Sequence, residues 1–456
     1  MLKKGETVEL KVEDLAYQGK AIAKLKSLVI FLNRGIPGDV VRAKITKIKP
    51  NYLEAEVEKI IDKSCLRIEP ACQHFGICGG CRLQDLKYEE QLKFKTKQVK
   101  ESLKHIAGLE NAFVEETLPS PDIFFYRNKM EFSFGTGEKA ELILGLHHLG
   151  KYDQNFDLVK CFLQSEESNQ VVRWVGDFAK EEGLVPYHVK THQGYLRYLM
   201  IREGKFTQQM MVNLVTYLGE FGVADKYAFG LRQKFPRIVS IVHNINSRLA
   251  NIALGQEQAV LYGKDTINEK IGEFEFEISS NSFFQTNSKQ VGRLYQLVLE
   301  SAGLRGDEVV WDLYSGCGGI SIILSPFVKK VIGVESSPEA NLDAQRNSNL
   351  NGMSNLQFVC SEVKPFLKER VNHKDKPQLV ILDPPRAGLH PKVIKYLIQL
   401  DAPKMIYVSC NPATLSRDLK GFLENGYNLK RVRPVDMFPH TFHIECVAEL
   451  EKKSKS

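Results

Sequence analysis

From about residue 280 onward, short apolar runs alternate with helical stretches, and no other feature of the sequence constrains the fold as strongly. The apolar runs are VVWDLYS, KVIGVES, LQFVCSE, QLVILDPP and KMIYVSCNP. Strands that alternate with helices in this way indicate a parallel, doubly wound sheet. The sequence therefore predicts an α/β, Rossmann-like domain over residues 280–456.

Residues 1–60 have a different pattern, in which apolar and polar residues alternate within short runs punctuated by Gly and Pro. This pattern predicts a small antiparallel β-barrel of about five strands. The segment holds 12 Lys and Arg against 8 Asp and Glu, an excess of 4 within the net charge of +7 of the whole chain. A small basic barrel is a common scaffold for binding nucleic-acid backbone, although a solvated β domain with incidental charge would have the same composition.

The sequence pattern of residues 61–279 predicts a mixed, largely antiparallel α+β middle domain. A polar helix is expected around residues 86–106 and a second helix around residues 168–183. Between and after them lie strand-like runs such as YRNKMEFSF, AELILGLHHLG, QQMMVNLVTYL and RIVSIVHNIN. A chain of 456 residues exceeds what one hydrophobic core usually supports, so three domains suit its length.

The composition also bears on where the protein works. The N-terminal residues lack the apolar run of a signal peptide, and no stretch reaches the roughly 18 uninterrupted apolar residues of a membrane span. Nine cysteines at irregular spacing argue against a disulfide framework and for metal binding or catalysis. We therefore expect a cytoplasmic protein with no membrane contact and no obligate protein partner, and a monomer.

A glycine-rich loop follows the first strand of the predicted sheet. The strand ends at Tyr314, and the residues Ser315-Gly316-Cys317-Gly318-Gly319 lead into a helix. Glycines allow the backbone to approach a ligand closely, and Glu335 at the end of the next strand can accept hydrogen bonds from ribose hydroxyls. These features predict a nucleoside-bearing cofactor, although the loop alone would suit a nicotinamide cofactor nearly as well.

Asp383 and Cys410 end two later strands, and ligands of open α/β sheets bind at such strand ends. Methylation of uracil at carbon 5 needs a cysteine of this kind, because C5 is a poor nucleophile until a thiolate adds to C6. A base must then remove the C5 proton, and Glu445 is a candidate. Taken singly, Cys410 could equally be a buried structural cysteine and Glu445 an exposed strand residue.

Four further cysteines form a second candidate site. Cys72, Cys78 and Cys81 follow a C-x5-C-x2-C pattern, and Cys161 lies far downstream. Three thiolates near one turn and a distant fourth could hold either zinc or a [4Fe-4S] cluster, and the spacing alone does not choose. The segment lacks the compact C-x3-C-x2-C motif of a radical mechanism, so we expect the group to be structural.

Taken together, these motifs resemble those of the TrmA-type uridine-5 RNA methyltransferase family over nearly the whole chain. The segments that carry the resemblance are Phe283-Phe284-Gln285-Thr286-Asn287, Ser409-Cys410-Asn411-Pro412-Ala413-Thr414-Leu415 with the following Arg417-Asp418, and residues 440–445. Residues 1–60 are similar to the TRAM domain of that family, which is an RNA-binding barrel.

The resemblance implies a role for each of these sites. Cys410 would be the nucleophile and Glu445 the proton acceptor. Iron-sulfur members of the family share the cysteine arrangement, which favours [4Fe-4S], and the barrel and cluster favour 23S ribosomal RNA, with one or two uridines modified, over the T loop of transfer RNA. The implied contacts to S-adenosylmethionine are Gln285, Tyr314, Glu335 and Asp383.

Arg127 opens the middle domain and is a candidate to hold the flipped nucleotide, which makes it an RNA contact. Lysines on the polar helix, namely Lys93, Lys95, Lys97 and Lys100, could bind phosphate or only form a solvated face. Two other functions compete with methylation: a nicotinamide-dependent iron-sulfur oxidoreductase, and an RNA-binding factor that has lost its chemistry. The first gives no role to Cys410, and an intact Cys410 and Glu445 argue against the second.

Overall fold

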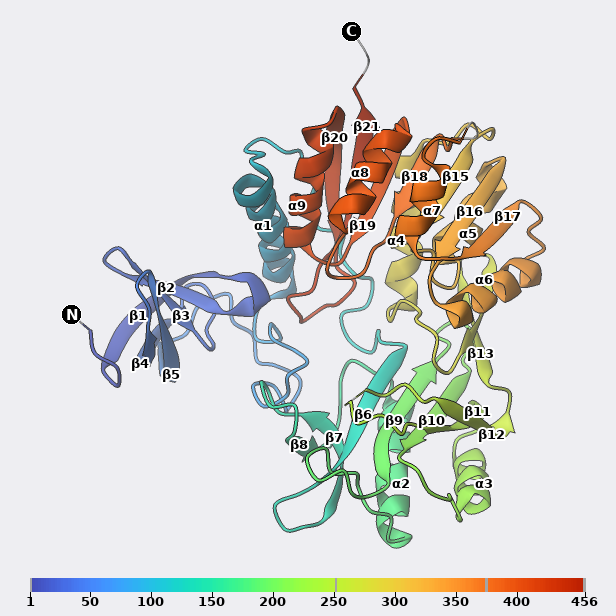
Figure 1. Cartoon of the computed structure of the whole chain (residues 1–456). Coiled ribbons are helices and arrows are strands. Elements are labelled where there is room, and N and C mark those ends of the chain that lie inside the picture. The colour runs from blue at the N-terminus through green and yellow to red at the C-terminus, as the bar shows by residue number, and fades with distance from the viewer. Residues whose placement is uncertain (1, 251, 374–375, 454–456) are drawn as a thin grey trace.

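The computed structural model of the protein describes residues 2–250, 252–373 and 376–453. Figure 1 shows a small barrel at the N-terminus, a sheet with its helices in the middle of the chain, and a second sheet flanked by helices at the C-terminal end. The predicted combination of an N-terminal barrel, a mixed middle region and a Rossmann-like C-terminal domain is confirmed.

The N-terminal barrel is closed in the strand order β1-β2-β3-β5-β4. Its neighbouring strands are antiparallel except β3 and β5, which are parallel, so the prediction of an antiparallel barrel is wrong for this pair. Leu10, Val12 and Ile30 lie in its interior, and residues at alternate positions along the strands face the solvent. Its elements are β1 Thr7–Leu15, the short 3-10 turn η1 Tyr17–Gly19, β2 Ala21–Leu25, β3 Leu28–Leu32, β4 Val40–Ile48 and β5 Tyr52–Asp62.

The middle sheet has seven strands in the order β12-β11-β10-β9-β6-β7-β8. Every neighbouring pair is antiparallel except β10 and β11, as expected for a largely antiparallel domain. The helices α2 and α3 join the sheet in one hydrophobic core. The elements are β6 Lys129–Thr136, β7 Leu142–His147, β8 Asn155–Asp157, α2 Glu166–Glu181, β9 Leu196–Glu203, β10 Met210–Thr216, α3 Ala224–Lys234, β11 Ile238–Ile245 and β12 Glu257–Gly263.

The C-terminal sheet has seven strands in the order β17-β16-β15-β18-β19-β21-β20. Its first five strands are parallel and apolar, and the last two are antiparallel, with β21 inserted between β19 and β20. A hairpin precedes the domain. The elements are β13 Thr266–Ile271, β14 Phe274–Ser279, α4 Ser288–Ala302, β15 Val309–Leu313, α5 Gly319–Leu324, η2 Ser325–Phe327, β16 Lys330–Glu335, α6 Pro338–Leu350, β17 Leu356–Cys360, α7 Val363–Arg370, β18 Leu379–Leu382, α8 Pro391–Leu400, β19 Lys404–Ser409, α9 Pro412–Leu423, β20 Tyr427–Val435 and β21 Glu445–Lys452.

Side-chain caps and prolines start the helices that follow the carboxyl ends of the parallel strands. Asn411 accepts a hydrogen bond from the Ala413 amide, and Pro412 occupies the first turn of α9. Ser337 and Pro338 start α6 in the same way. Because proline has no amide hydrogen to lose and the caps satisfy free amides, each helix begins directly after its strand-end loop.

The polar helix α1, Tyr88–Ala107, lies beside the C-terminal sheet although it precedes the middle sheet in sequence (Figure 1). Its buried residues Val99 and Leu103 share one hydrophobic core with Leu415 and Leu419 of α9. No helix in the described part of the chain is long and apolar enough to cross a bilayer.

Candidate active site

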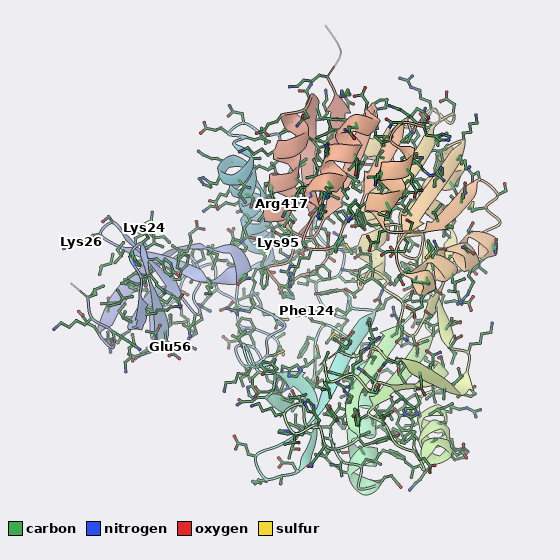
Figure 2. All side chains as sticks on the ribbon, in the orientation of Figure 1. Lys24, Lys26, Glu56, Lys95, Phe124 and Arg417 are labelled. Carbon is green, nitrogen blue, oxygen red and sulfur yellow. The ribbon has the colours of Figure 1, made fainter. Side chains whose placement is uncertain are left out.

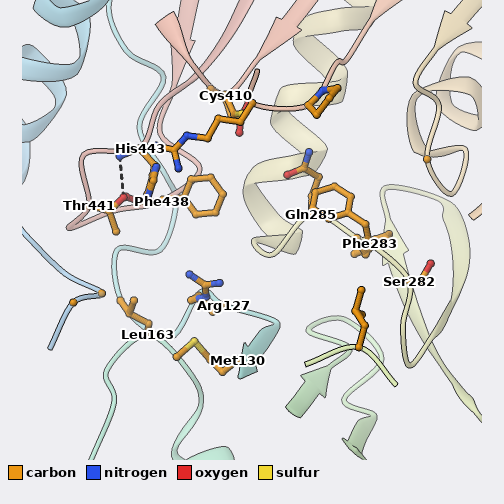
Figure 3. A pocket seen from close by; sticks show the side chains of 18 of the residues that line it. Arg127, Met130, Leu163, Ser282, Phe283, Gln285, Cys410, Phe438, Thr441 and His443 are labelled. Carbon is orange, nitrogen blue, oxygen red and sulfur yellow. Dashed lines mark hydrogen bonds between the residues drawn. The ribbon is translucent and has the colours of Figure 1, made fainter. Parts of the chain in front are cut away.

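A cavity of about 1120 Å³ lies between the carboxyl ends of the C-terminal strands and the middle sheet. Every residue predicted for the cofactor, the chemistry, the metal and the RNA contact lines it. Figure 3 shows Cys410 on one wall and Arg127 on the opposite wall, with Gln285 and Phe438 beside the space between them. The structure thus brings together side chains that are spread through the sequence from Cys72 to Glu445.

The glycine-rich loop opens directly onto the cavity. Gly316 and Gly318 have φ values of 54° and 83°, and a Cβ on Gly318 would lie 3.0 Å from the Phe358 ring. No atom lies within 4 Å of the Cβ position of Gly316, so this face of the loop is free to meet a ligand. The loop therefore has the conformation that the sequence pattern requires of a nucleoside-binding turn.

Glu335 at the end of β16 is held by the backbone around it. Its carboxylate accepts hydrogen bonds from the amide of Gly316 at 3.1 Å and from the amide of Ser337 at 2.8 Å. Carboxylates in this position of a doubly wound sheet bind ribose hydroxyls. Tyr314, at the end of β15, has a φ of 68° and lines the cavity next to this loop.

Cys410 and Glu445 face each other across neighbouring strands. In the antiparallel ladder between β19 and β21, Ser409 pairs with Cys446, so the next residue pair in that register is Cys410 and Glu445. Burial raises the pKa of the Cys410 thiol to about 11, with the carboxyl groups of Glu445 and Asp383 adding to the shift. Without a ligand the thiol is therefore protonated at neutral pH.

The protonation equilibria of the two carboxyl groups of this site are also shifted towards the neutral forms. Burial raises the pKa of Glu445 well above its usual value, and the nearby Asp383 raises it further. Burial and then Asp312 raise the pKa of Asp383 to about 7. Since every group here resists a negative charge, a cationic ligand would be stabilised in the cavity and would favour their ionisation.

Hydrogen bonds from α9 fix the loop that follows Asp383. Asn411 donates to the Arg386 carbonyl at 3.3 Å, and Arg417 donates to the Leu389 carbonyl at 3.2 Å. Asp418, which is fully buried, accepts from the Leu389 amide at 2.7 Å. The Arg417-Asp418 pair quoted in the sequence thus has a structural task that the sequence did not reveal.

Gln285 and Arg127 reach the cavity from the junction of the middle and C-terminal domains. The Gln285 carbonyl accepts from Asn128 at 2.8 Å. The Arg127 amide donates to the Leu163 carbonyl at 2.8 Å, and its Nε donates to the Lys129 carbonyl at 3.2 Å. Backbone contacts therefore hold Arg127 opposite Cys410, where it lines the same space.

The four cysteines of the second candidate site line the other end of the cavity. Burial raises the pKa of Cys81 to about 12, and the thiols of Cys161, Cys78 and Cys72 contribute to that shift because they are close. Four sulfurs around one zinc ion, each at roughly 2.3 Å, would be tightly packed. Within the described residues, no group of three or more His, Cys, Asp or Glu side chains is placed so that it could hold a metal ion.

Sequence reasoning did not single out three side chains that line the cavity, namely Phe438, Thr441 and His443. Burial, together with the charges of Arg386, Lys95 and Arg127, lowers the pKa of His443 to about 4, so its ring is neutral. The His443 amide donates to Thr441 Oγ at 3.1 Å, as Figure 3 shows. These residues belong to the segment that carries Glu445, and that position was the available clue.

Known proteins resemble the chain over its whole length. The family model described as tRNA (Uracil-5-)-methyltransferase matches residues 231–453, and the TRAM domain model matches residues 2–57. An uncharacterized RNA methyltransferase of Chlorobaculum tepidum is 38% identical over 99% of this chain and 97% of its own length. Another from Caldanaerobacter subterraneus is 37% identical over 98% of this chain and 99% of its own.

A solved structure gives the same picture. The tRNA (uracil-54, C5)-methyltransferase of Pyrococcus abyssi, in complex with S-adenosyl-L-homocysteine, superimposes with a TM-score of 0.79 at 32% identity. The superposition covers 97% of this chain and 99% of that one. The likeness therefore includes the barrel, the middle sheet and the C-terminal sheet.

Proposed function

We propose, from the membership of this chain in the TrmA-type family of RNA (uracil-5-)-methyltransferases, that Cys410 is the nucleophile and Glu445 the base. Enzymes of this family use S-adenosylmethionine as the methyl donor. The Cys410 thiolate adds to C6 of the target uracil, and the electron pair of the C5=C6 bond becomes available at C5. C5 then takes the methyl group from the sulfonium, releasing S-adenosylhomocysteine. Glu445 removes the C5 proton, the C5=C6 bond re-forms, and the thiolate leaves.

The single observation that carries this assignment is the register of β19 and β21, which sets Cys410 beside Glu445 at the rim of the cavity. A thiol and a carboxyl group from adjacent strands can reach the two neighbouring carbons of one pyrimidine ring. The same rim holds Asp383 and the glycine-rich loop. Nucleophile, base and methyl donor can therefore meet at one base extracted from its stack.

The cofactor site would combine four contacts. The Glu335 carboxylate suits the ribose hydroxyls, because the Gly316 and Ser337 amides already fix its orientation. Asp383 would face the sulfonium end, since its shifted pKa reflects a site in which a cation is favourable. The full set of proposed contacts to S-adenosylmethionine is Gln285, Tyr314, Glu335 and Asp383.

Labelled S-adenosylmethionine and uridine-containing RNA test the activity. We expect methylation at C5 by the wild-type protein, a covalent adduct with 5-fluorouridine RNA, and loss of both in Cys410→Ala. The exposed Cys65 supplies the control, and Cys65→Ala should retain both. Methylation at the normal rate by Cys410→Ala would reject the mechanism.

We propose 23S ribosomal RNA as the substrate, with one or two uridines modified. The barrel and the four-cysteine segment support this choice, while the Pyrococcus abyssi relative, named for uridine 54 of tRNA, makes the T loop the alternative. Incubation with separated ribosomal and transfer RNA, followed by mapping of the labelled nucleotide, decides between them. Label confined to tRNA would overturn the ribosomal assignment.

We further propose that Cys72, Cys78, Cys81 and Cys161 hold a [4Fe-4S] cluster. All four cysteines line the same cavity, and the resemblance of their arrangement to that of the iron-sulfur members of the family supports a cluster in which each thiolate binds a different iron. The bound cluster would supply a covalent link between residues 72–81 and Cys161. Anaerobically purified protein should contain iron and acid-labile sulfide in equal amounts, and zinc alone would reject the cluster.

Arg127 is the proposed contact to the flipped nucleotide, and its test is a comparison of two affinities. Arg127→Ala should weaken RNA binding and leave S-adenosylmethionine binding unchanged, because Arg127 lies across the cavity from Cys410 and is not one of the proposed cofactor contacts. An equal loss of both affinities would contradict a direct RNA contact.

A further inference from the structure

The connection between β20 and β21, residues 436–444, leads directly to the proposed base. It presents Phe438, Thr441 and His443 to the cavity, and Glu445 follows as the first residue of β21. The segment contains no helix or strand, so contacts with other elements must fix its course. Any shift of this connection would move Glu445 relative to Cys410.

A buried ion pair ties the start of the connection to α1. Lys95 and Asp436 are both completely buried, and Lys95 Nζ lies 2.6 Å from Asp436 Oδ1. Lys95 also donates to the Phe438 carbonyl at 3.1 Å, and the Tyr88 hydroxyl donates to Asp436 Oδ2 at 2.9 Å. Both interpretations of Lys95, a phosphate contact and part of a solvated face, are therefore wrong, because its side chain is completely buried.

A second set of contacts holds the middle of the connection at His440. This residue has a φ of 66°, in the left-handed region that residues other than glycine adopt uncommonly. The His440 amide donates to Gln91 Oε1 of α1 at 2.9 Å. Its carbonyl accepts from the amides of Arg82 and Leu83, at 2.9 and 3.0 Å, directly after Cys81.

The same helix also supports the nucleophile. The apolar residues Val99 and Leu103 of α1 pack in one core with Leu415 and Leu419 of α9, and α9 begins two residues after Cys410. One face of α1 thus contacts the element that follows Cys410, and its polar residues hold the connection that precedes Glu445. The helix is the common support of both groups.

We propose that α1 sets the relative position of nucleophile and base, and that Lys95 and Asp436 are positioning residues for proton removal by Glu445. The inference rests on the proposed function. A buried ion pair contributes little net stability, because desolvation offsets the attraction, so orientation of the connection is the better account of its presence. Neither Lys95 nor Asp436 is among the described residues that line the cavity. Both residues therefore act through the backbone of residues 436–444.

The mechanism gives this idea a specific readout. If Glu445 is displaced while Cys410 and the cofactor site stay in place, the thiolate still adds to C6 and C5 still takes the methyl group. The C5 proton then stays on the ring, the C6–S bond does not break, and a methylated protein-RNA adduct accumulates with ordinary uridine RNA. General loss of structure would instead reduce every step together.

The test uses the full-length holoenzyme with Lys95→Met/Asp436→Asn, which removes both charges and keeps a hydrogen-bond acceptor for Tyr88. We expect kcat to fall about tenfold or more, since small displacements of reacting groups have large effects. The KM for RNA should change less than about twofold, and trapping by 5-fluorouridine RNA should stay within about threefold of wild type. An adduct with uridine RNA should appear on a denaturing gel, as in Glu445→Gln.

Tyr88→Phe, which removes one hydrogen bond to Asp436, is the milder variant and should show a smaller effect of the same kind. The control is Lys104→Met on the same helix, because Lys104 is exposed and its partner Glu110 lies outside residues 436–444, so kcat and trapping should stay at the wild-type level. Unchanged kcat in the double variant, or a fall in 5-fluorouridine trapping in proportion to kcat without a uridine adduct, would overturn the proposal. A wild-type protein that neither methylates nor traps RNA would instead reject the proposed function.

Discussion

At the scale of single residues, the sequence identified chemical groups better than their surroundings. Cys410 and Glu445 could be named as candidates because each follows or starts an apolar strand in a recognisable motif. Cys410 and Glu445 lie opposite each other because β21 is inserted beside β19, and no local sequence pattern encodes that insertion. Lys95 was misread for a similar reason, since its partner Asp436 lies 341 residues away in sequence.

The raised pKa of Asp383 predicts that the affinities for S-adenosylmethionine and S-adenosylhomocysteine depend differently on pH. The pKa of Asp383 is raised to about 7, mainly by burial, so the group is protonated below that pH. A sulfonium is stabilised by the ionised form, and its affinity should rise by about tenfold as the pH increases from about 6 to about 8. The homocysteine product has an uncharged sulfur and should bind with a much flatter profile.

Calorimetric titration of both ligands over this range measures the difference, and Asp383→Asn should remove it.

The effect of pH on the free energy of unfolding has the opposite sign to its effect on the affinity for the sulfonium. Because the folded pKa of Asp383 lies above its ordinary value of 3.8, its contribution to the unfolding free energy is present at low pH and is lost as the pH rises to about 7. Equal pH profiles for the two ligands would show that Asp383 does not face the sulfonium.

At the scale of elements, burial decided which strands could be predicted. The parallel strands of the C-terminal sheet are apolar throughout because helices cover both faces, so their positions were evident. Strand β9 was not among the runs named from the sequence, and it carries three charged residues, Arg197, Arg202 and Glu203, all of which are buried. Backbone carbonyls compensate the two arginines: Arg202 donates to Ser282 at 2.7 Å, and Arg197 to Asn246 at 2.8 Å.

The loop between β18 and α8 provides a prediction at this scale. Gly388 has a φ of 76°, and a Cβ there would lie 2.6 Å from both Arg417 Nη2 and Asp418 Oδ2. Gly388→Ala should therefore displace the pair that fixes the loop after Asp383. We expect a loss of about 3 kcal/mol in the free energy of unfolding and a raised KM for S-adenosylmethionine.

Gly352 supplies the matched control for this substitution. It has a similar φ of 65°, but no atom lies within 4 Å of its Cβ position. Gly352→Ala should therefore carry only the conformational penalty, about 1 kcal/mol, with no effect on the cofactor. Urea unfolding and cofactor titration measure both quantities. Equal effects of the two substitutions would mean that the Arg417-Asp418 contact does not hold the loop.

At the scale of the whole molecule, the order of barrel, middle sheet and C-terminal sheet followed from composition and periodicity, but their connections did not. Arg67, just after the barrel, lies 2.5 Å from Asp39 inside it and also pairs with Asp85. The exposed pair of Lys97 with Asp14 joins α1 to the barrel. These contacts join parts that are remote in sequence, so they could not be predicted from local patterns.

The basic barrel should contribute to RNA binding but not to the chemical step. Lys24 in β2 and Lys26 in the turn between β2 and β3 are exposed on the barrel (Figure 2), and neither is among the described residues that line the cavity. The double substitution Lys24→Ala/Lys26→Ala should raise the KM for RNA and leave kcat unchanged.

Each phosphate contact that is lost lowers the slope of log affinity against log salt by about 1. The double variant should therefore bind RNA with a slope smaller by about 2 if both lysines contact phosphate. Glu56→Gln, on β5 of the same barrel, removes a negative charge and should not reduce the slope. A fall in kcat with an unchanged slope would mean that these lysines act on the catalytic domain, because loss of phosphate contacts affects binding alone.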